Sequence, residues 1–433
     1  MLNQVKLVKK ASLSLAYTKT ADKNNLLALI AKNLAKNKQK IIKANLIDQA
    51  KAKHLLNSGE LTKPLLERLI LNDEKIAQLS NYCEAVANLA DPAAKVLSKT
   101  MLDDGLVLTK ITEPFGVIAS IFESRPEVVV QVASLALKSG NGVILKGGSE
   151  AKHTNQCLSQ IIKESLANYN LADALVLIET RGQVSEILAM EEHIDLIIPR
   201  GSNQFVKYIQ DNTRIPVMGH SGGVCHVYVA ANANLAEALN IVIDSKTDYP
   251  SACNAVETLL LDEKIAKDFL AKFLLSPKIR NIKLFADRSA SEMITAKGVV
   301  VKIIENDWEK EYNDLAISIK LVKGIDEAIT HINKHGSKHT DSILTENSKE
   351  ALKFLNQVDS ASVVHNASTR FADGFVFGLG AEVGISTGKY HARGPVGLEG
   401  LVTTKWRLVG KGHIKGDYGA APKKSFKHQN LLT

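Results

Sequence analysis

The sequence predicts an α/β fold with parallel sheets, preceded by a group of helices. From Pro114 onward, short apolar runs alternate with helix-length segments, and this alternation is typical of a parallel sheet covered on both faces. A second stretch of the same kind begins near residue 246. Residues 1 to about 90 instead carry apolar side chains at steps of three and four, as in Ile76, Leu79 and Cys83. This spacing predicts amphipathic helices with Cys83 in the core.

The composition agrees with a folded protein of two or three domains over 433 residues. The hydrophobic fraction of 45% and the charged fraction of 23% exclude a wholly disordered chain. Lys and Arg number 54 and Asp and Glu 46, so the net charge of +8 favours an anionic ligand without requiring nucleic acid. No run reaches the ~18 apolar residues of a membrane helix. The cysteines form no C-x-x-C pair, so we expect reduced thiols in a cytoplasmic protein.

The predicted elements follow the helices in a definite order. Residues 99–113 alternate around Asp104-Gly105, which predicts a β-hairpin. A glycine-rich stretch over 371–400 is expected to cross between domains. Strands of the first sheet are expected at 117–122, 142–145, 174–178, 194–198 and 224–229, and those of the second at 258–261, 299–304 and 317–322, before a helix at 326–334.

Two strand ends in the first sheet combine cations with small residues. Lys146 and Ser149 flank two glycines after the strand at 142–145, and Arg200, Gly201 and Ser202 follow the strand at 194–198. Parallel sheets bind ligands at the carboxyl ends of their strands, and N–H groups at a helix start attract anions. The G-x-G-x-x-G fingerprint and the Walker A loop are absent. These ends therefore predict a dinucleotide site of another kind.

Cys253 is the candidate nucleophile. It lies in a polar turn, 248–255, between a helix and a strand, whereas structural cysteines favour an apolar stripe. The spacing alone leaves open whether this thiol is reactive or structural. Cys225 is expected in the sheet and Cys157 in a helix.

Three histidines follow one another at four-residue steps: His331, His335 and His339. On one helix face they would form a metal site. Gly336 interrupts the helix and no acidic ligand shares the face, so we expect no metal there. His339 instead begins a loop-to-strand step, and we place it near the active site.

Motifs spread in order over most of the chain carry a family resemblance. They are EPFGVIASIFESRPE (113–127), VILKGGSEA (143–151), PVMGHSGGVCHVYV (216–229), DYPSACNAVETLL (248–260), HGSKHTDSILTE (335–346), STRFADGFVFGLGAEVGIST (368–387) and HARGPVGLEGLVTTKW (391–406). With them the sequence resembles the γ-glutamyl phosphate reductases, also called glutamate-5-semialdehyde dehydrogenases. It is equally similar to the reductase half of pyrroline-5-carboxylate synthase, in the aldehyde dehydrogenase superfamily.

The resemblance implies an aldehyde dehydrogenase-like fold, with a Rossmann-like cofactor domain, an α/β catalytic domain and an oligomerisation hairpin. A homo-oligomer is therefore expected. The implied domains are 1–98 and 114–245 for NADP(H) binding, 99–113 for the hairpin, 246–378 for catalysis, and 379–433 for the return to the cofactor domain and an oligomerisation segment.

The resemblance also implies roles for single residues. Cys253 matches the catalytic cysteine, and Lys146 matches the lysine that contacts the adenosine ribose and its phosphate. Gly201 and Ser202 match the helix start near the pyrophosphate, and Glu311 matches the glutamate that holds the nicotinamide ribose. The expected cofactor-binding set is Lys146, Gly148, Ser149, Arg200, Gly201, Ser202 and Glu311.

The sequence departs from ordinary aldehyde dehydrogenases at several positions. The stretch 219–223 lacks the glutamate that activates a hydrolytic water, in keeping with reduction of an acyl phosphate. Ser124 stands at about the place of the asparagine near the thioester oxygen and is the second candidate catalytic residue. The oxyanion is expected to use the Cys253 amide and other donors. Ser149 replaces a glutamate of NAD-preferring relatives, which favours NADPH. Glu127 replaces an asparagine, with no consequence that we can assign.

The implied reaction is NADPH-dependent reduction of γ-glutamyl phosphate to glutamate 5-semialdehyde through a Cys253 thioester, in proline biosynthesis. Arg125, His339, Arg370 and Arg393 are expected to bind the substrate, and for each arginine a structural salt bridge is the alternative. A glutamate kinase partner is a further hypothesis. The alternative functions are a hydrolytic aldehyde dehydrogenase, disfavoured by the missing glutamate, and a nucleic-acid-binding protein, disfavoured by the lack of a basic stripe.

Overall fold

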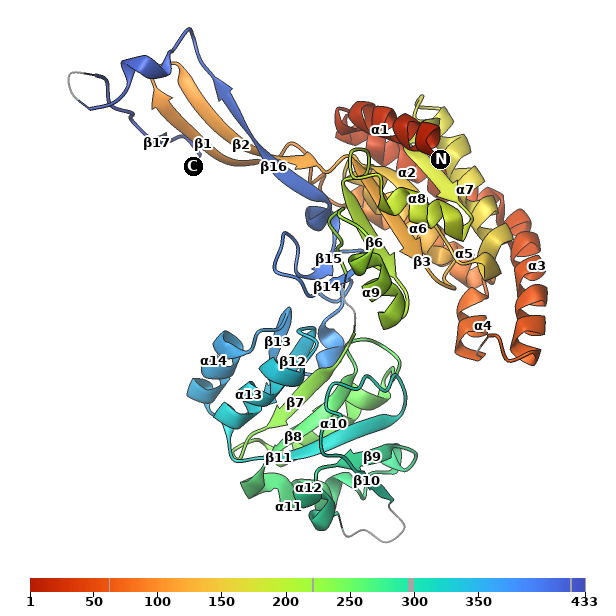
Figure 1. Ribbon diagram of the computed structural model, residues 1–433, viewed down its shortest axis with the longest axis vertical. Coiled ribbons are helices and arrows are strands. Elements are labelled where there is room, and N and C mark those ends of the chain that lie inside the picture. Colours follow the sequence, from red (N-terminus) through yellow and green to blue (C-terminus); the bar gives the residue numbers. More distant parts are fainter. Residues whose placement is uncertain (62, 220–221, 295–299, 421–422, 433) are drawn as a thin grey trace.

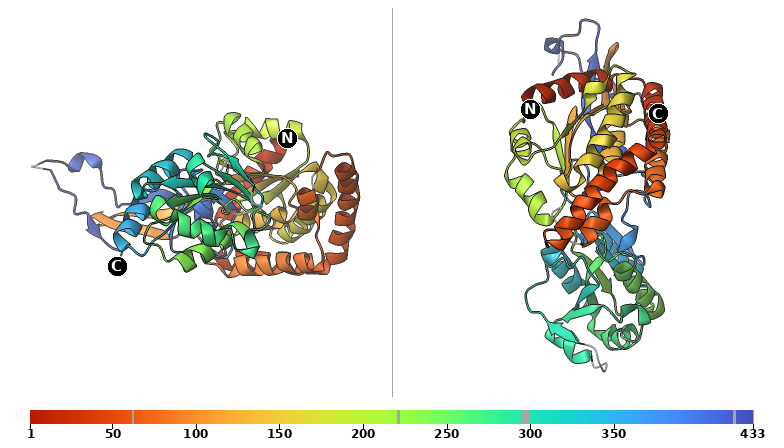
Figure 2. Two further views of the ribbon diagram at one scale, coloured as in Figure 1. Left: turned by 90° about the horizontal axis from the view of Figure 1, so that it is seen from below. Right: turned by 90° about the vertical axis from the view of Figure 1, so that its right-hand side faces the viewer.

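The computed structural model describes residues 1–61, 63–219, 222–294, 300–420 and 423–432. It has three parts: a helix-covered sheet that includes the N-terminus, a second α/β unit, and a sheet that protrudes from the first unit and carries the C-terminus (Figure 1). The right-hand view of Figure 2 shows the second unit below the first and joined to it over a narrow region. Within the described ranges, every helix is too short or too polar to cross a membrane.

The N-terminal residues form helices, which confirms the prediction from their apolar spacing. Cys83 is buried in the core, as expected. The side chain of Asn72 caps the fifth helix by accepting a hydrogen bond from the Lys75 amide. The helices are α1 (Leu2–Ala16), α2 (Thr20–Lys36), α3 (Lys38–Asn57), α4 (Lys63–Leu69) and α5 (Asp73–Asn88).

The first sheet is parallel and has the strand order β5-β4-β3-β6. Buried side chains of β3 and β4 alternate between its two faces. One face packs against α2, α5, α6 and α7, and the other packs against α1, α8 and α9. The strands are β3 (Val117–Phe122), β4 (Gly142–Lys146), β5 (Leu175–Ile178) and β6 (Leu196–Arg200); the helices are α6 (Glu127–Lys138), α7 (Lys152–Ala167), α8 (Arg181–Leu188) and α9 (Asn203–Asp211).

The second sheet is also parallel, with the order β10-β9-β11-β8-β7-β12-β13. Its core is dominated by apolar side chains of β7, β8, β11, α10 and α11. The strands are β7 (Cys225–Val229), β8 (Val256–Asp262), β9 (Lys283–Ala286), β10 (Val301–Ile303), β11 (Ala316–Val322), β12 (Thr340–Leu344) and β13 (Ser362–His365). The helices are α10 (Leu235–Thr247), α11 (Glu263–Phe273), α12 (Arg288–Met293), α13 (Ile325–His335) and α14 (Ser348–Gln357).

The expected domain boundary at 245/246 is wrong. The strand predicted at 224–229 is β7, which pairs with β8 and β12 in the second sheet, and α10 follows it there. Alternation shows that a strand exists, but only long-range pairing decides which sheet receives it. The described part of the strand predicted at 299–304 is β10, and residue 299 lies outside the described residues.

The predicted hairpin at 99–113 is confirmed and is longer than expected. It belongs to an antiparallel sheet with the order β16-β2-β1-β17. The chain from 379 onward passes through a short β14–β15 pair and then adds β16 beside β2 of the hairpin, and its role in oligomerisation stays a prediction. The strands are β1 (Val96–Asp103), β2 (Leu106–Pro114), β14 (Gly384–Ser386), β15 (Gly394–Val396), β16 (Val402–Val409) and β17 (Gln429–Asn430).

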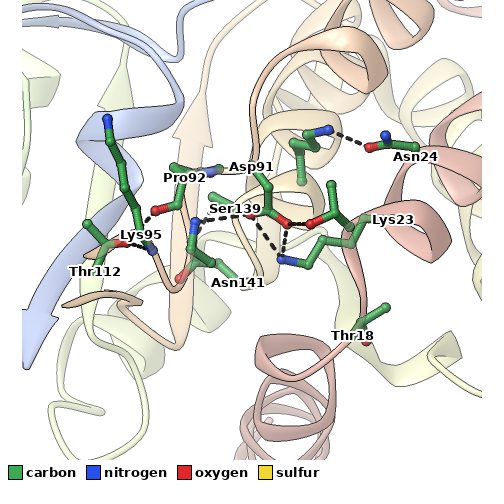
Figure 3. A network of polar contacts seen from close by, with 12 residues as sticks. Thr18, Lys23, Asn24, Asp91, Pro92, Lys95, Thr112, Ser139 and Asn141 are labelled. Carbon is green, nitrogen blue, oxygen red and sulfur yellow. Dashed lines mark hydrogen bonds and ion pairs between the residues drawn. The ribbon is translucent and has the colours of Figure 1, made fainter. Parts of the chain in front are cut away.

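A buried polar network ties the base of the protruding sheet to the helices (Figure 3). The Lys23 ammonium, 2% exposed, lies 3.0 Å from a carboxylate oxygen of Asp91. Immediately after Asp91, the Pro92 carbonyl accepts a hydrogen bond from the Thr112 hydroxyl at 2.5 Å, and that hydroxyl oxygen accepts from the Lys95 amide. Moving Asp91 away from Lys23 would leave a buried charge without its partner, which is costly. The network therefore holds in place the segment that leads into β1.

Candidate active site

The candidate nucleophile Cys253 lies in the loop between α10 and β8, and its side chain is half-buried. Two turns shape this loop. The Ala252 amide donates to the Tyr249 carbonyl, and the Ala255 amide donates to the Ala252 carbonyl, each at 3.0 Å. The Cys253 Sγ lies 3.1 Å from Nε2 of His339, which precedes β12 and is buried. An imidazole at this distance from a thiol is placed to accept its proton.

Sheet register explains why these two residues meet across a separation of 86 in sequence. The strands β8 and β12 are both neighbours of β7, and Cys225 of β7 aligns with Val256, while His226 aligns with Asp341. The loops before these parallel strands therefore share one edge. The nucleophile lies at the amino edge of the second sheet, whereas the predicted anion-binding strand ends lie at the carboxyl edge of the first.

Cys225 supports the site from behind. Its Sγ donates to the Cys253 carbonyl at 3.2 Å and lies 3.8 Å from Nδ1 of His339, which is also 2.9 Å from the Thr340 hydroxyl. Burial raises the pKa of Cys225 well above its usual range, so this thiol stays protonated. The Cys225 side chain is therefore a neutral donor beside the nucleophile.

Gly223 packs directly under the nucleophile loop. A Cβ at this position would lie 2.2 Å from the Cys253 carbonyl oxygen and 2.6 Å from the Cys253 Cα, so only glycine fits without moving the loop. His220 and Ser221, in the stretch that lacks the hydrolytic glutamate, lie outside the described residues.

Ser124 follows β3 in a left-handed conformation, with φ of 42°. Its amide and its hydroxyl donate to one oxygen of Glu150, at 2.7 and 2.6 Å. The Ser124 hydroxyl thus already donates a hydrogen bond to Glu150. Its expected role near the thioester oxygen stays a prediction.

The Glu150 carboxylate also lies at the end of β4. Lys146 is the last residue of β4, and Ser149 begins a short 3₁₀ helix. A Cβ at Gly148 would lie 1.9 Å from Glu150 Oε1, so the carboxylate rests on the glycine backbone. A carboxylate is therefore present at this strand end even though residue 149 is a serine. The preference for a 2′-phosphate stays a prediction.

The end of β6 has the same design. Arg200 ends the strand, and the Ser202 amide at the start of α9 donates to Oε2 of Glu123 at 2.9 Å. A Cβ at Gly201 would lie 2.5 Å from that oxygen. The chain's own carboxylate thus sits where the positive end of a helix would receive a phosphate.

Glu311 reaches this same helix start from the second unit. The Asn203 side-chain amide, in the first turn of α9, donates to Glu311 Oε2 at 2.8 Å. The predicted nicotinamide-ribose glutamate and the predicted pyrophosphate site are thereby brought together.

Arg125 is a cation beside the nucleophile loop. Burial, and then the nearby charges of Arg200 and Arg68, lower the pKa of Arg125, and Tyr249 lies close enough to oppose the shift. In the described part of the chain, neither Arg125 nor Arg200 forms an ion pair. The negative charge of Glu127 also opposes the shift, and binding of an anionic substrate by Arg125 stays a prediction.

Arg370 and Arg393 are held by carboxylates of the chain. Arg370 donates from Nε to Asp248 at 3.1 Å and from Nη1 to the Asn254 side chain, so its partners flank Cys253. Arg393 donates to the Asp359 carboxylate at 3.0 Å. These contacts agree with the salt-bridge alternative, and substrate binding by either arginine stays a prediction.

The three histidines do not share a face. His339 is directed to Cys253, whereas His331 and His335 pack against each other on α13, with ring centroids 4.7 Å apart. Burial, and then neighbouring cations, lower the pKa of His331 to about 2, so its ring stays neutral.

Sequence reasoning missed the residues that act through tertiary contact. Glu123 lies in the loop after β3 and Glu150 in the 3₁₀ helix after β4, and sequence spacing does not predict their contacts at the strand ends. Gly223 had a signal, because a Gly-Gly pair before a strand often marks a close backbone approach.

Comparison with known proteins places this geometry in a family. The model of the aldehyde dehydrogenase family matches residues 3–290. The chain is 49% identical to a gamma-glutamyl phosphate reductase of Pelotomaculum thermopropionicum, over 98% of this chain and 96% of the relative. It is 47% identical to one of Methanococcoides burtonii, over 98% and 95%. The crystal structure of a gamma-glutamyl phosphate reductase from Thermotoga maritima superposes with a TM-score of 0.91, at 39% identity, covering 96% of this chain and 99% of that one. The chain belongs to the aldehyde dehydrogenase family and, within it, to the gamma-glutamyl phosphate reductases.

Proposed function

We propose that the chain reduces γ-glutamyl phosphate to glutamate 5-semialdehyde and phosphate, through a thioester on Cys253. The observation that carries this proposal is the 3.1 Å approach of Cys253 Sγ to His339 Nε2, at the amino edge of the second sheet. The names of the relatives support the choice of substrate. The product would enter proline biosynthesis, and a kinase would have to supply the acyl phosphate.

The first half of the reaction forms the thioester. His339 accepts the Cys253 proton, and the sulfur attacks the acyl carbon. The bond between that carbon and the phosphate oxygen breaks, its electron pair leaves with phosphate, and the proton on His339 passes to the departing oxygen. Donors such as the Cys253 amide stabilise the negative oxygen that develops during the attack. Covalent catalysis speeds the reaction because it replaces one difficult reduction with two easier steps.

The second half requires a nicotinamide cofactor, which members of the aldehyde dehydrogenase family use. Lys146 and Arg200 supply positive charge at these strand ends, and the Glu150 and Glu123 carboxylates that rest against Gly148 and Gly201 would have to move aside for the cofactor. NADPH, when bound, supplies the hydride that converts the thioester to the aldehyde. The Cys253 thiolate is then released and takes up a proton from solvent. The residues proposed to hold the cofactor are Lys146, Gly148, Ser149, Arg200, Gly201, Ser202 and Glu311.

The choice of NADPH over NADH is a finer part of the proposal. The net positive charge and Lys146 favour a 2′-phosphate, whereas the Glu150 carboxylate against Gly148 opposes it. Comparing the Michaelis constants of the two cofactors in wild type and Glu150→Gln decides between these effects. We expect wild type to favour NADPH and the variant to favour it further.

The reaction is tested with purified protein in the reverse direction. Glutamate semialdehyde, NADP and phosphate should give NADPH in wild type. Cys253→Ala should abolish this activity. His339→Asn should lower it by roughly the 10²–10⁴-fold that acid–base catalysis contributes. A Cys253→Ala protein that keeps wild-type activity would contradict the proposal, and activity that ignores phosphate would favour a hydrolytic dehydrogenase.

A further inference from the structure

We propose that Glu257, buried on β8, is a positioning residue that sets Glu311 for the cofactor. This inference rests on the proposed function, because it assumes that Glu311 holds the nicotinamide ribose. Glu257 touches neither substrate nor cofactor site directly. It acts through the turn that carries Glu311.

Glu257 is fixed by a buried ion pair. Its Oε2 lies 2.8 Å from the ammonium of Lys246 on α10, and both side chains are 1% exposed. Placing two charges in the interior costs about as much free energy as their attraction returns, so such a pair is weak evidence for a stabilising role. The geometry around the second carboxylate oxygen points to another role.

That second oxygen holds a turn. Glu257 Oε1 accepts a hydrogen bond from the Asn313 amide at 3.2 Å, and Asn313 is left-handed, with φ of 53°. The preceding residue, Tyr312, is also fixed, since its hydroxyl lies 2.8 Å from that of Ser318 on β11. Two successive residues of the turn are therefore held to the second sheet.

Glu311 is the next residue toward the N-terminus, and it is directed to the first unit. Its Oε2 accepts from the Asn203 side chain at 2.8 Å, beside the start of α9. A continuous series of contacts thus runs from α10 through Glu257, Asn313 and Glu311 to the proposed pyrophosphate site. Changing Glu257 should move Glu311 without touching the cofactor.

The charge state of Glu257 is sensitive to pH in the neutral range. Burial raises the pKa of Glu257 to about 7, against the attraction of Lys246. The other titratable groups that act on it or feel it are Glu311, Tyr312 and Cys225. A carboxylate is a stronger acceptor than a protonated carboxyl group, so the grip on Asn313 should weaken as the pH falls through 7.

The test is titration calorimetry of NADP onto the full-length protein at pH 8 and pH 6. Glu257→Gln and Glu311→Gln should each weaken NADP binding at pH 8 by about tenfold, as expected for a lost charged hydrogen bond. The double variant should bind no more weakly than Glu311→Gln alone, since the two residues act in series. The weakening between pH 8 and pH 6 should be smaller in Glu257→Gln than in wild type.

Asp91→Asn is the matched control. It breaks the buried Lys23–Asp91 pair among the N-terminal helices, so it should lower the melting temperature and leave the dissociation constant of NADP unchanged. If Glu257→Gln does not fold, the neutral pair Lys246→Met with Glu257→Gln replaces it and should show the same loss.

Unchanged NADP binding in Glu257→Gln would overturn the inference, as would losses that multiply in the double variant. Either result would leave the proposed reaction intact, because that reaction is judged by wild-type turnover and by Cys253→Ala. Unchanged binding in Glu311→Gln would overturn both this inference and the cofactor role of Glu311.

Discussion

Gly223 shows how a single residue without a side chain can control the nucleophile. A methyl group there would overlap the Cys253 backbone, so Gly223→Ala should displace the loop. Because a misplacement of about 1 Å can cost ~10²-fold in rate, we expect kcat/KM to fall by about that factor. The measurement is steady-state kinetics with the reverse assay.

Gly182→Ala is the control for that variant, because nothing lies within 4 Å of a Cβ at Gly182 in α8. Alanine is the better helix former by roughly 1 kcal/mol, so activity should be kept and stability should not fall. Equal activities for the two alanine variants would show that the Cys253 loop tolerates displacement.

Glu123 gives a second prediction for a single residue. Its carboxylate accepts a hydrogen bond from the Ser202 amide, so it competes with a phosphate for the start of α9. Glu123→Gln removes the negative charge, so NADP binding should tighten severalfold, while Glu164→Gln, on the exposed end of α7, should change nothing. Isothermal titration compares the three proteins. Weaker binding in Glu123→Gln would mean that the carboxylate shapes the site for the cofactor.

Local signals were sufficient for some of these residues and insufficient for others. Cys253 stands out as a thiol in a polar turn away from any core stripe, but its spacing alone leaves open whether it is reactive or structural. His339 was placed near the site but was expected to bind substrate, because nothing local reveals that β7 separates its strand from β8. Contacts such as Ser124 with Glu150 depend on how loops fold over a sheet, and spacing does not encode that.

At the level of elements, periodicity predicted the helices and most of the strands. It did not reveal β9, β13 or the strands β14 to β17, and it indicated β12 only through the loop-to-strand step at His339. It also assigned β7 to the wrong sheet. Buried parallel strands look alike in sequence, and only the pairing of their backbones distinguishes the two sheets.

The ion pairs of Asp359 predict how the stability of the protein depends on pH. Asp359, just before β13, lies 3.0 Å from Arg393, 3.0 Å from Lys389 and 3.3 Å from Lys338. Burial opposes ionisation, but the hydrogen bonds from Lys389, Arg393 and Lys338 prevail and lower the pKa of Asp359 to about 2. A carboxyl with a lowered pKa stabilises the fold above its unfolded value of 3.8, and this contribution is lost as the pH falls toward 2.

Asp359→Asn should therefore lower the melting temperature at pH 7, and the difference from wild type should shrink between pH 4 and pH 3. Thermal melts across this range measure the effect. A difference that stays constant with pH would show that the charge of Asp359 contributes nothing to stability.

At the scale of the whole molecule, the protruding sheet has an exposed apolar strand at one edge. Its strand β16 exposes Trp406, Leu408 and Val409, each at more than half of its surface, on a sheet edge open to pairing. We propose that a second copy of the chain covers it. Val409→Asp should shift the mass measured by light scattering toward the monomer, while Leu352→Asp, equally exposed on α14, should not. A wild-type monomer would contradict this proposal.

The central claim of the proposed function is that Cys253 forms a thioester which phosphate, and not water, resolves. The most direct measurement mixes wild type with glutamate semialdehyde and NADP in a buffer free of phosphate. NADPH should form in a burst of about one equivalent per site and then stop, with the acyl group found on Cys253 by mass spectrometry. Adding phosphate should restart turnover. Steady NADPH formation without phosphate, or a burst with no acyl group on Cys253, would contradict the claim.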